Sequence, residues 1–263
     1  MSHDPLPILL RSLRLPAMAE EYDGAIQRAE AENWGYQKFL GYLAETESSQ
    51  RLSNKVRRLL AQADLLKGKT FATLDVNRWP EKVRRQLPTI LEPDFVRRGD
   101  NLLCFGLPGR GKSSFASAVA HEWITRHQFK VLFISTFKLV GQLLAAKREL
   151  KFNALIAKLQ HYDAIICDQL GYTQQSTEEG EVLFHFLAER YEIKSVVITS
   201  NLVFSQWDQV FHNPMTAMAA ADRLVHHGAI LEFTNESIRA PNSGLVATPP
   251  APMTPSPASN AGA

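Results

Sequence analysis

The sequence lacks several features that would assign a protein to a specialised class. Only two cysteines occur, Cys104 and Cys167, each inside a short apolar run and without a Cys-x-x-Cys pair. We expect both thiols to pack in a buried core rather than to bind metal or take part in redox chemistry. No apolar run approaches the roughly 20 residues that cross a bilayer, and the N-terminal stretch lacks the pattern of a secretory signal. We therefore expect a cytoplasmic protein and not a membrane protein.

A large excess of charge of one sign is also missing. The 29 Lys and Arg residues nearly balance 27 Asp and Glu residues, which leaves a net charge of +2. A binding surface needs local rather than global basicity, so this balance excludes neither nucleic-acid nor protein partners. The hydrophobic content of 45% is ordinary for a globular protein. A chain of 263 residues can form one substantial core with a smaller attached unit.

The pattern of the sequence changes along the chain and predicts four segments. Residues 1–66 carry apolar residues at helical spacing, broken by "ENWG", and are predicted to form a small all-α domain. Residues 67–100 contain three prolines and are predicted to be a connector. Residues 101–239 form the predicted core. Residues 240–263 are rich in Pro, Ala and Ser and are predicted to be a disordered tail.

Short apolar runs that alternate with longer amphipathic stretches define the predicted core. The runs are "NLLCF", "KVLFIS", "DAIICD", "SVVITSN" and "GAILEF". Such runs separated by helices are typical of strands buried on both faces. The fold class is therefore α/β, with a parallel five-stranded sheet covered by helices.

A glycine-rich segment after the first predicted strand indicates a nucleotide site. "GLPGRGKS" matches G-x-x-x-x-G-K-[ST] and precedes a predicted helix from about Lys112 to His127. The glycines let backbone N–H groups turn toward phosphate oxygens, and the helix N-terminus adds partial positive charge. Lys112 is expected to reach the outer phosphates of ATP, and the Ser113 hydroxyl to ligate Mg²⁺. The residues expected to contact ATP are Gly106, Leu107, Pro108, Gly109, Arg110, Gly111, Lys112, Ser113 and Ser114.

Two further polar residues end predicted strands. Asp168 follows the run "AIIC", which places its carboxylate at the carboxyl edge of the sheet, where it can hold magnesium. Asn201 ends "VVITSN". If its strand lies between those that carry the phosphate loop and Asp168, its amide can orient the attacking water. The alternative is that Asn201 serves only the chemistry of a turn.

From Leu102 to Arg239 the chain resembles the AAA+ ATPases of the DnaC-like clade, and most closely the IstB-like helper ATPases of insertion-sequence transposition. The segments that carry the resemblance are "GLPGRGKSS", "DQLGYTQQSTEEGEVLFHFLAERYE", "SVVITSNLVFSQWDQVF" and "MAAADRLVHHGAILEF", with support from "LRLPAMAEEY". It implies an AAA+ P-loop core without a C-terminal lid domain, ATP-dependent self-assembly on DNA, and recruitment or stimulation of a partner transposase. Arg223 matches the arginine that enters the nucleotide site of a neighbouring subunit, although an ordinary surface role remains the alternative.

Gln169 departs from the pattern of this family, in which an acid usually follows the magnesium aspartate and polarises the attacking water. Glutamine can hold a water but cannot accept its proton, so we expect ATP binding to persist and turnover to be weak. The departure is either natural or engineered to trap the ATP-bound assembly, and the second explanation is the one we favour. Glu178 or Glu179 is an alternative acid, but the start of a helix explains both equally well.

Basic residues gather in two places. The first group, in "RLSNKVRRLL", comprises Arg51, Lys55, Arg57 and Arg58, and the second comprises Lys147, Arg148 and Lys151. Helical spacing places Arg51, Lys55 and Arg58 on a solvent stripe, while Leu52, Val56, Leu59 and Leu60 are expected to face the core. Both groups are candidates to grip double-stranded DNA through its phosphates, with little sequence preference. A merely solvated helix face is the alternative for each.

Two adjacent histidines, His226 and His227, invite a metal or catalytic interpretation. Neighbouring residues on a helix point about 100° apart, and the sequence offers no third ligand, so we favour a structural or interface role. Two rival functions remain open for the whole chain. A replicative helicase loader of the DnaC type would prefer single-stranded DNA, whereas a small-molecule kinase would need an acceptor site that the sequence does not reveal.

Overall fold

The computed structural model describes residues 5–172 and 175–237, so the predicted tail at residues 240–263 lies outside it. The helices are α1 (Leu6–Ser12), α2 (Pro16–Ala31), α3 (Tyr36–Gln62), η1 (Val76–Arg78), α4 (Glu81–Leu91), α5 (Pro93–Arg97), α6 (Lys112–His127), α7 (Thr136–Arg148), α8 (Phe152–Leu159), α9 (Thr177–Arg190), η2 (Phe204–Gln206), α10 (Asp208–Phe211) and α11 (Pro214–His226). The strands are β1 (Asn101–Phe105), β2 (Val131–Ser135), β3 (Ala164–Leu170), β4 (Ser195–Ser200) and β5 (Gly228–Glu232). None of the described helices is both long and apolar enough to span a bilayer.

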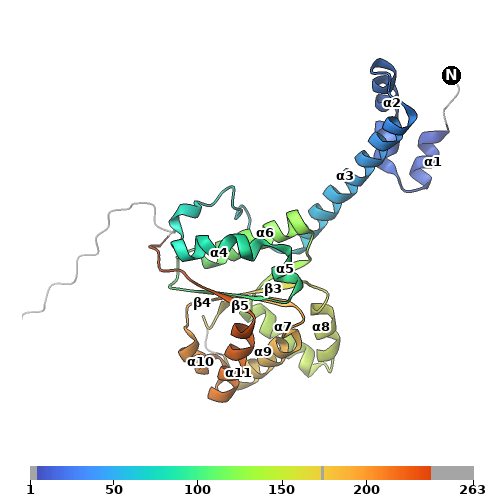
Figure 1. Ribbon diagram of the computed structural model, residues 1–263. Helices are drawn as coiled ribbons and strands as arrows, with labels where there is room; N and C mark the ends of the chain where they lie inside the picture. Colours follow the sequence, from blue (N-terminus) through green and yellow to red (C-terminus); the bar gives the residue numbers. More distant parts are fainter. Residues whose placement is uncertain (1–4, 173–174, 238–263) are drawn as a thin grey trace, which may run out of the picture.

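The five strands form one parallel sheet in the order β2-β3-β4-β1-β5. The predicted α/β class and all five predicted strands are confirmed. Helices cover both faces of the sheet, with α4, α5 and α6 on one side and α7, α9, α10 and α11 on the other (Figure 1). Each face has its own apolar cluster, because every side chain of β1 and β4 is buried and successive residues point to opposite faces.

Residues 67–100, predicted as a connector, form part of the helical layer of the core. Trp79 and Val83 lie in the same apolar cluster as β1 and α6. The Trp123 indole donates a hydrogen bond to the Ile90 carbonyl oxygen at 2.9 Å, and the Trp123 ring stacks on Phe95 at 6.0 Å between centroids. Pro88 lies inside α4 and Pro93 begins α5, so the prolines do not prevent this stretch from being buried.

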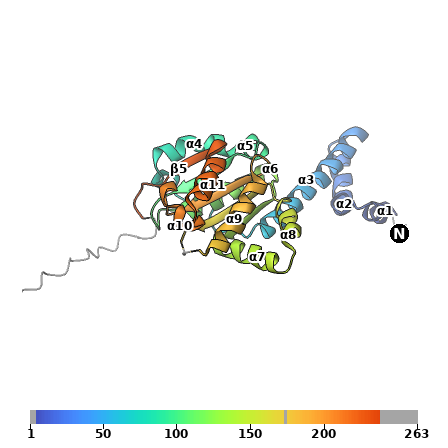
Figure 2. The ribbon, with the colours of Figure 1, turned by 90° about the horizontal axis from the view of Figure 1, so that it is seen from below.

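The N-terminal helices form a separate, smaller unit that projects from the core (Figure 2). A cluster of Leu10, Met18, Ala19, Ala25 and Leu43 holds α1 and α2 against the first half of α3. The Glu47 carboxylate, only 5% exposed, accepts hydrogen bonds from the backbone N–H groups of Ala17 and Met18 at 2.8 and 3.2 Å. A side chain of α3 therefore satisfies the free N–H groups at the start of α2.

The middle of α3 crosses from this unit to the core with its side chains exposed, although Arg51 still bonds to Glu47 and to the Arg14 carbonyl oxygen of the N-terminal unit. All residues from 48 to 55 are exposed, and we call this segment the α3 stem. The expectation that Leu52 faces the core is wrong, because its side chain is 47% exposed. Leu59 and Ala63 are buried, and the Ala63 carbonyl oxygen accepts a hydrogen bond from the Phe133 N–H at 2.8 Å. Helical periodicity gave the correct face only where α3 touches the core.

Both cysteines are free and buried, as predicted. Burial raises the pKa of the Cys167 thiol to about 12, and it raises the pKa of Cys104 as well. Neither thiol forms a reactive thiolate at neutral pH.

Candidate nucleotide-binding site

The glycine-rich loop connects the carboxyl end of β1 to the start of α6, and α6 begins at Lys112 as predicted. Gly106, Gly109 and Gly111 have φ values of 147°, 82° and 92°, which side chains with a Cβ rarely adopt. A Cβ on Gly106 would lie 2.5 Å from the Phe233 carbonyl oxygen. The loop therefore needs glycine for its backbone conformation and for its close approach to the chain after β5.

A cleft of about 600 Å³ lies above this loop. Its walls include Pro108, Gly109, Gly111, Lys112, Ser113 and Ser114 from the loop and α6, and Gln169, Thr199 and Asn201 from the ends of β3 and β4. Gly106, Leu107 and Arg110, also expected to contact ATP, are not among the lining residues. Leu107 is 59% exposed, and the Arg110 guanidinium donates to the Phe233 carbonyl oxygen at 3.1 Å. Of the residues expected to contact ATP, Arg110 thus has a side chain that anchors the loop to the chain after β5.

Lys112 is 7% exposed, and its ammonium group lies among oxygen atoms of the loop. The Nζ atom donates to the carbonyl oxygens of Gly106 and Leu107 at 2.6 and 3.0 Å and to Asn201 Oδ1 at 3.3 Å. Since β4 lies between β1 and β3, the condition placed on Asn201 from the sequence is met. Lys112 and Asn201 therefore line the same cleft within hydrogen-bond distance of each other.

A bulge shapes the end of β3. Cys167 pairs with Ile198 and Leu170 pairs with Ser200, so Asp168 and Gln169 together face the single residue Thr199. Gln169 is the residue with left-handed backbone, at a φ of 63°. Bulges of this kind often lie beside functional sites, where they redirect a side chain.

Thr199 links both residues of the bulge. Its hydroxyl donates to Asp168 Oδ1 at 2.6 Å and accepts from the Gln169 N–H at 2.9 Å. Asp168 is 6% exposed and is hydrogen-bonded to Thr199, which lines the cleft. Gln169 lines the cleft itself. A carboxylate and the Ser113 hydroxyl are the hard oxygen ligands that Mg²⁺ prefers, so the residues at this edge suit that ion.

Glu178 and Glu179 have partners outside the cleft. Glu179 and Ser176 form a capping box, in which the Ser176 N–H donates to Glu179 Oε2 at 2.6 Å and the Glu179 N–H donates to the Ser176 hydroxyl at 3.3 Å. Glu178 lies 3.8 Å from the Arg148 guanidinium. Both acids are explained by the start of α9.

Arg223 lies near the carboxyl end of α11, which leads directly into β5. Gly228 of β5 pairs with Asn101 at the amino end of β1, whereas the phosphate loop follows the carboxyl end of β1. Arg223 and the phosphate loop of the same chain are therefore at opposite edges of the sheet. The guanidinium carbon lies 4.7 Å from the centre of the Phe184 ring, and Arg223 forms no salt bridge within the described residues.

Several residues of the two basic groups form salt bridges with nearby acids, which the sequence did not predict. Arg51 forms a salt bridge to Glu47 at 2.7 Å, so it belongs to the packing of the N-terminal unit rather than to a free stripe. Lys147 and Lys151 lie 3.4 and 2.9 Å from Glu181 and Glu149, and Arg148 pairs with Glu178.

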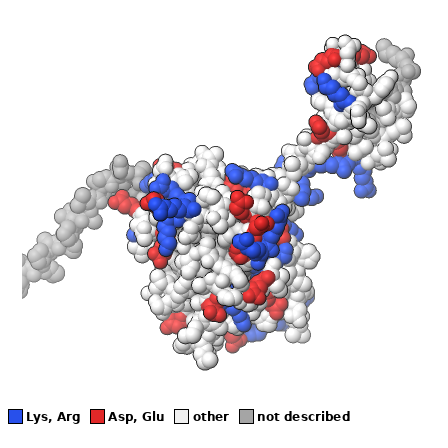
Figure 3. Space-filling view, viewed as in Figure 1, with Lys and Arg blue, Asp and Glu red and all other residues white. Residues whose placement is uncertain are grey.

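Lys55 and Arg58 are exposed near the α3 stem, and Arg57 is exposed and donates to Asn54 Oδ1 at 2.7 Å. Figure 3 shows basic side chains beside α3 and a further group over the α4 side of the core, where Lys82, Arg84 and Arg85 are exposed.

Sequence reasoning missed the part of the cleft that residues 66–79 supply. These lining residues are Leu66, Lys69, Thr73, Leu74, Asp75, Arg78 and Trp79. Trp79 is 3% exposed and packs edge-on against Phe115 of α6 at 5.0 Å. The aromatic residues of this stretch were the only signal of its burial, and no spacing rule places them beside a distant loop. Thr199 was missed too, although it stands two residues before Asn201 on the same strand.

The parallel sheet, the glycine loop that opens α6 and the polar residues at the carboxyl ends of β3 and β4 define an AAA+ P-loop ATP-binding protein. A family model described as "IstB-like ATP binding protein" matches residues 8–245, and the chain belongs to this family.

Relatives with known names support the assignment. The chain is 38% identical to a putative insertion sequence ATP-binding protein of Sinorhizobium fredii, over 89% of this chain and 78% of the relative. It is 32% identical to the putative ATP-binding protein of insertion sequence IS5376 from Geobacillus stearothermophilus, over 86% of this chain and 90% of that protein. The chain is thus similar to ATP-binding proteins of insertion sequences.

Solved structures show the same fold at low identity. The DnaC helicase loader superposes with a TM-score of 0.50 at 20% identity, covering 59% of this chain and 91% of the loader. A replication initiator DnaA, bound to AMPPCP and single-stranded DNA, gives a TM-score of 0.55 at 14% identity, covering 66% of this chain and 52% of DnaA. At such identities the likeness concerns the fold alone.

Proposed function

We propose that this chain is an ATP-dependent, DNA-binding helper of transposition, which assembles on duplex DNA and recruits or stimulates a partner transposase. The observation that carries the proposal is the convergence of Lys112, Gln169, Thr199 and Asn201 on one cleft above the phosphate loop. Membership of the IstB-like family supports the link to insertion sequences. In this proposal residues 1–66 engage DNA, the ATPase core at 101–239 works together with residues 67–100, which pack on it and line its cleft, and the protein acts in the cytoplasm.

The roles of the cleft residues follow from their chemistry. Lys112 exchanges its carbonyl partners for the outer phosphates of ATP, and the loop N–H groups hold the remaining phosphate oxygens. Ser113 and Asp168 hold Mg²⁺, which offsets phosphate charge. Asn201 orients the attacking water. Thr199 fixes Asp168 and the backbone of Gln169 at once, so it is a positioning residue.

Gln169 limits hydrolysis in this proposal because an amide cannot remove the proton from water. Replacing it by the acid, Gln169→Glu, is expected to raise steady-state phosphate release about 100-fold or more, the usual contribution of a general base. The affinity for ATP should stay within a few fold of the parent value. An unchanged rate of phosphate release would show that position 169 does not limit turnover.

Assembly depends on Arg223 in this proposal. Because Arg223 lies at the edge of the sheet opposite its own phosphate loop, we infer that it reaches the nucleotide of a neighbouring copy, which joins the copies head to tail. Sedimentation of the protein with Mg²⁺·ATP and duplex DNA should reveal an oligomer. Arg223→Ala should bind ATP but remain a monomer, whereas the control Arg97→Ala, an exposed arginine of α5, should still assemble. A parent chain that stays monomeric with ATP and DNA would contradict the proposal.

DNA binding is assigned to the side chains near the α3 stem, chiefly Lys55, Arg57 and Arg58. Contacts to phosphates carry little sequence information and weaken steeply with salt. Binding of the ATP-loaded protein to random duplexes and to single strands over a salt series tests this assignment. A preference for single strands would favour the helicase-loader alternative, and affinity that ignores salt would exclude phosphate contact.

A further inference from the structure

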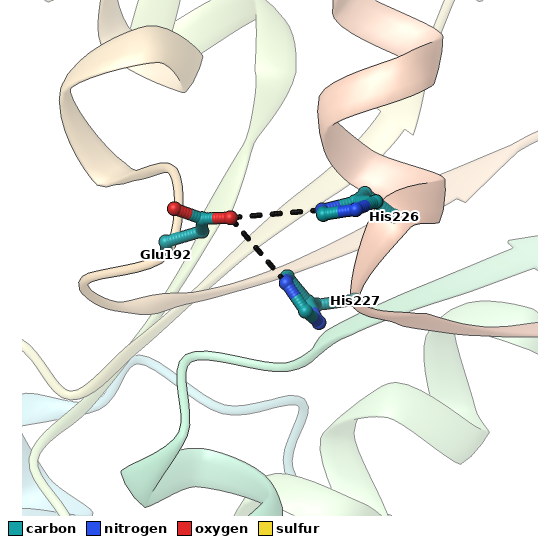
Figure 4. Close-up of side chains that lie close together, drawn as sticks. All are labelled: Glu192, His226 and His227. Atoms are coloured by element: carbon teal, nitrogen blue, oxygen red, sulfur yellow. Dashed lines mark ion pairs between the residues drawn. The ribbon is translucent and has the colours of Figure 1, made fainter.

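A cluster of two histidines and one glutamate lies at the amino edge of the sheet, opposite the nucleotide cleft. Glu192 Oε1 lies 3.6 Å from His226 Nδ1 and 3.4 Å from His227 Nε2 (Figure 4). The three ligand atoms all lie within 4.8 Å of one another. Both objections raised from the sequence fail here, because His227 lies beyond the last residue of α11 and Glu192 supplies the third group.

The spacing suits a transition-metal ion. Zinc binds imidazole nitrogen and carboxylate oxygen at about 2.0–2.2 Å in tetrahedral geometry, which separates the ligand atoms by about 3.4 Å. The two nitrogen to oxygen distances in the cluster, 3.6 and 3.4 Å, match this separation. Two histidines and one carboxylate are a common ligand set for zinc sites that keep a fourth position open.

Close backbone packing holds the two histidines in place. A Cβ on Gly228 would lie 2.4 Å from the Leu224 carbonyl oxygen, so only glycine permits this direct turn from α11 into β5. The backbone N–H of Asn101 donates to the His227 carbonyl oxygen at 2.6 Å. The buried Asn101 side chain accepts from the Val196 N–H at 3.0 Å and donates to the Leu224 carbonyl oxygen at 3.4 Å. The end of α11 is thereby fixed to β1 and β4.

The loop between α9 and β4 holds Glu192 in the same way. Glu192 has a left-handed φ of 57°, and a Cβ on Gly99 would lie 3.3 Å from the backbone of Glu192 and Ile193. Tyr191 lies beside the cluster, with its hydroxyl 2.9 Å from His226 Nδ1. The backbone that carries all three groups is therefore fixed, while the side chains are exposed and open to an ion from solvent.

We propose that Glu192, His226 and His227 bind one Zn²⁺ ion, with a fourth position open to water or to another ligand. The Tyr191 hydroxyl releases His226 Nδ1 when the ion binds. The ion would join the end of α11 to the α9–β4 loop, one helical turn from Arg223. This proposal does not depend on the proposed function, since it concerns the opposite edge of the sheet and needs neither ATP nor DNA.

Titration of the full, untagged chain with Zn²⁺ after removal of metal by a chelator tests the proposal. We expect one ion per chain, and an affinity that falls at least about 10-fold in Glu192→Gln and in His227→Ala. The matched control is His185→Ala. His185 also lies 3.4 Å from a carboxylate, that of Glu189, but within the described residues no third metal-binding side chain lies beside this pair. That variant should bind Zn²⁺ as the parent does.

A second measurement keeps the test independent of any change in folding. Co²⁺ bound in four-coordinate geometry absorbs visible light strongly, and this absorption should develop with the parent chain and His185→Ala but not with His226→Ala. If the parent binds Zn²⁺ no more tightly than a His226→Ala, His227→Ala double variant, the cluster is only a carboxylate–histidine ion pair and the proposal is wrong. An equal loss in the His185→Ala control would also overturn it.

Discussion

The N-terminal helical unit and the ATPase core are stabilised in different ways. The unit buries a few small or flexible side chains, including Met18 and Leu43, and depends on one carboxylate that links α3 to α2. The core buries large side chains on both faces of its sheet, including Phe115, Trp123 and Phe186, each 0% exposed. The comparison teaches that the nucleotide cleft is built on two large apolar clusters, whereas the N-terminal unit has only one small cluster of its own, so we expect that unit to loosen without unfolding the sheet.

The largest expected effect comes from truncating a central strand. Ile166→Ala removes a fully buried side chain of β3 and should cost about 2–5 kcal/mol of unfolding free energy. Leu43→Ala, the matched change in the N-terminal unit, should cost about 2 kcal/mol and loosen only that unit. Hydrogen exchange resolved by segment measures both. If Leu43→Ala also lowered protection in β1, the two regions would fold as one cooperative unit and the comparison would fail.

Nucleotide binding should depend on the core alone. Lys112→Ala removes the ammonium group beside Gly106 and Asn201 and should weaken ATP binding about 100-fold, or about 2.7 kcal/mol. Titration with a fluorescent ATP analogue measures the change. The control Lys82→Ala, at an exposed position on α4, should bind as the parent does. Proteolytic resistance of α2 should be the same in all three proteins.

The pH dependence of the N-terminal unit should come from Glu47. Burial alone would raise the pKa of Glu47, but hydrogen bonds from Arg51 and from the N–H groups of Met18 and Ala17 outweigh it and lower the pKa. A carboxyl whose pKa is lowered by folding adds stability above the unfolded value of 4.5, and this stability is lost as pH falls through the folded pKa.

Exchange protection in α2, taken relative to the intrinsic exchange rate at each pH, should therefore fall below about pH 4.5, by an amount equivalent to about 1–3 kcal/mol. Glu47→Gln should be less stable at pH 7 and should lose this part of the pH dependence. A parent and variant that respond alike to acid would mean that Glu47 does not link α2 to α3. Exchange in β1 serves as the internal reference.

The smallest expected effect separates exposed from paired basic residues. Lys55→Ala should lower the slope of log affinity against log salt by about 0.9 for each lost phosphate contact on duplex DNA. Lys147→Ala should change the slope little, because Lys147 already pairs with Glu181 at 3.4 Å. Fluorescence anisotropy over a salt series measures both. Equal slopes for these variants would place the DNA on a different surface.

The sequence predicted the core of this protein well because its signals are local. Each strand is a short apolar run, and the turn from β1 to α6 needs glycines at fixed offsets from Lys112. The features that were missed depend on contacts between distant segments. Trp79 reaches the cleft by packing on Phe115, and Glu181 neutralises Lys147 from another helix.

The histidines illustrate the same limit on a smaller scale. Helical geometry predicted divergent side chains at His226 and His227, but α11 ends at His226 and the chain turns at Gly228. Glu192, distant in sequence, completes the cluster. Helical periodicity predicts the direction of a side chain only for residues that lie inside the helix.

The α3 stem holds the N-terminal unit at a distance from the core. Its eight exposed residues, each rising 1.5 Å along the helix axis, separate the N-terminal unit from the core by about 12 Å. The end of α3 is fixed beside β2, because the Ala63 carbonyl oxygen accepts a hydrogen bond from the Phe133 N–H. A change in the angle of α3 at this point would displace the N-terminal unit by a larger amount than the core. Inserting one residue in the α3 stem would rotate the N-terminal unit by about 100° around the helix axis and would not change the residues that line the nucleotide cleft.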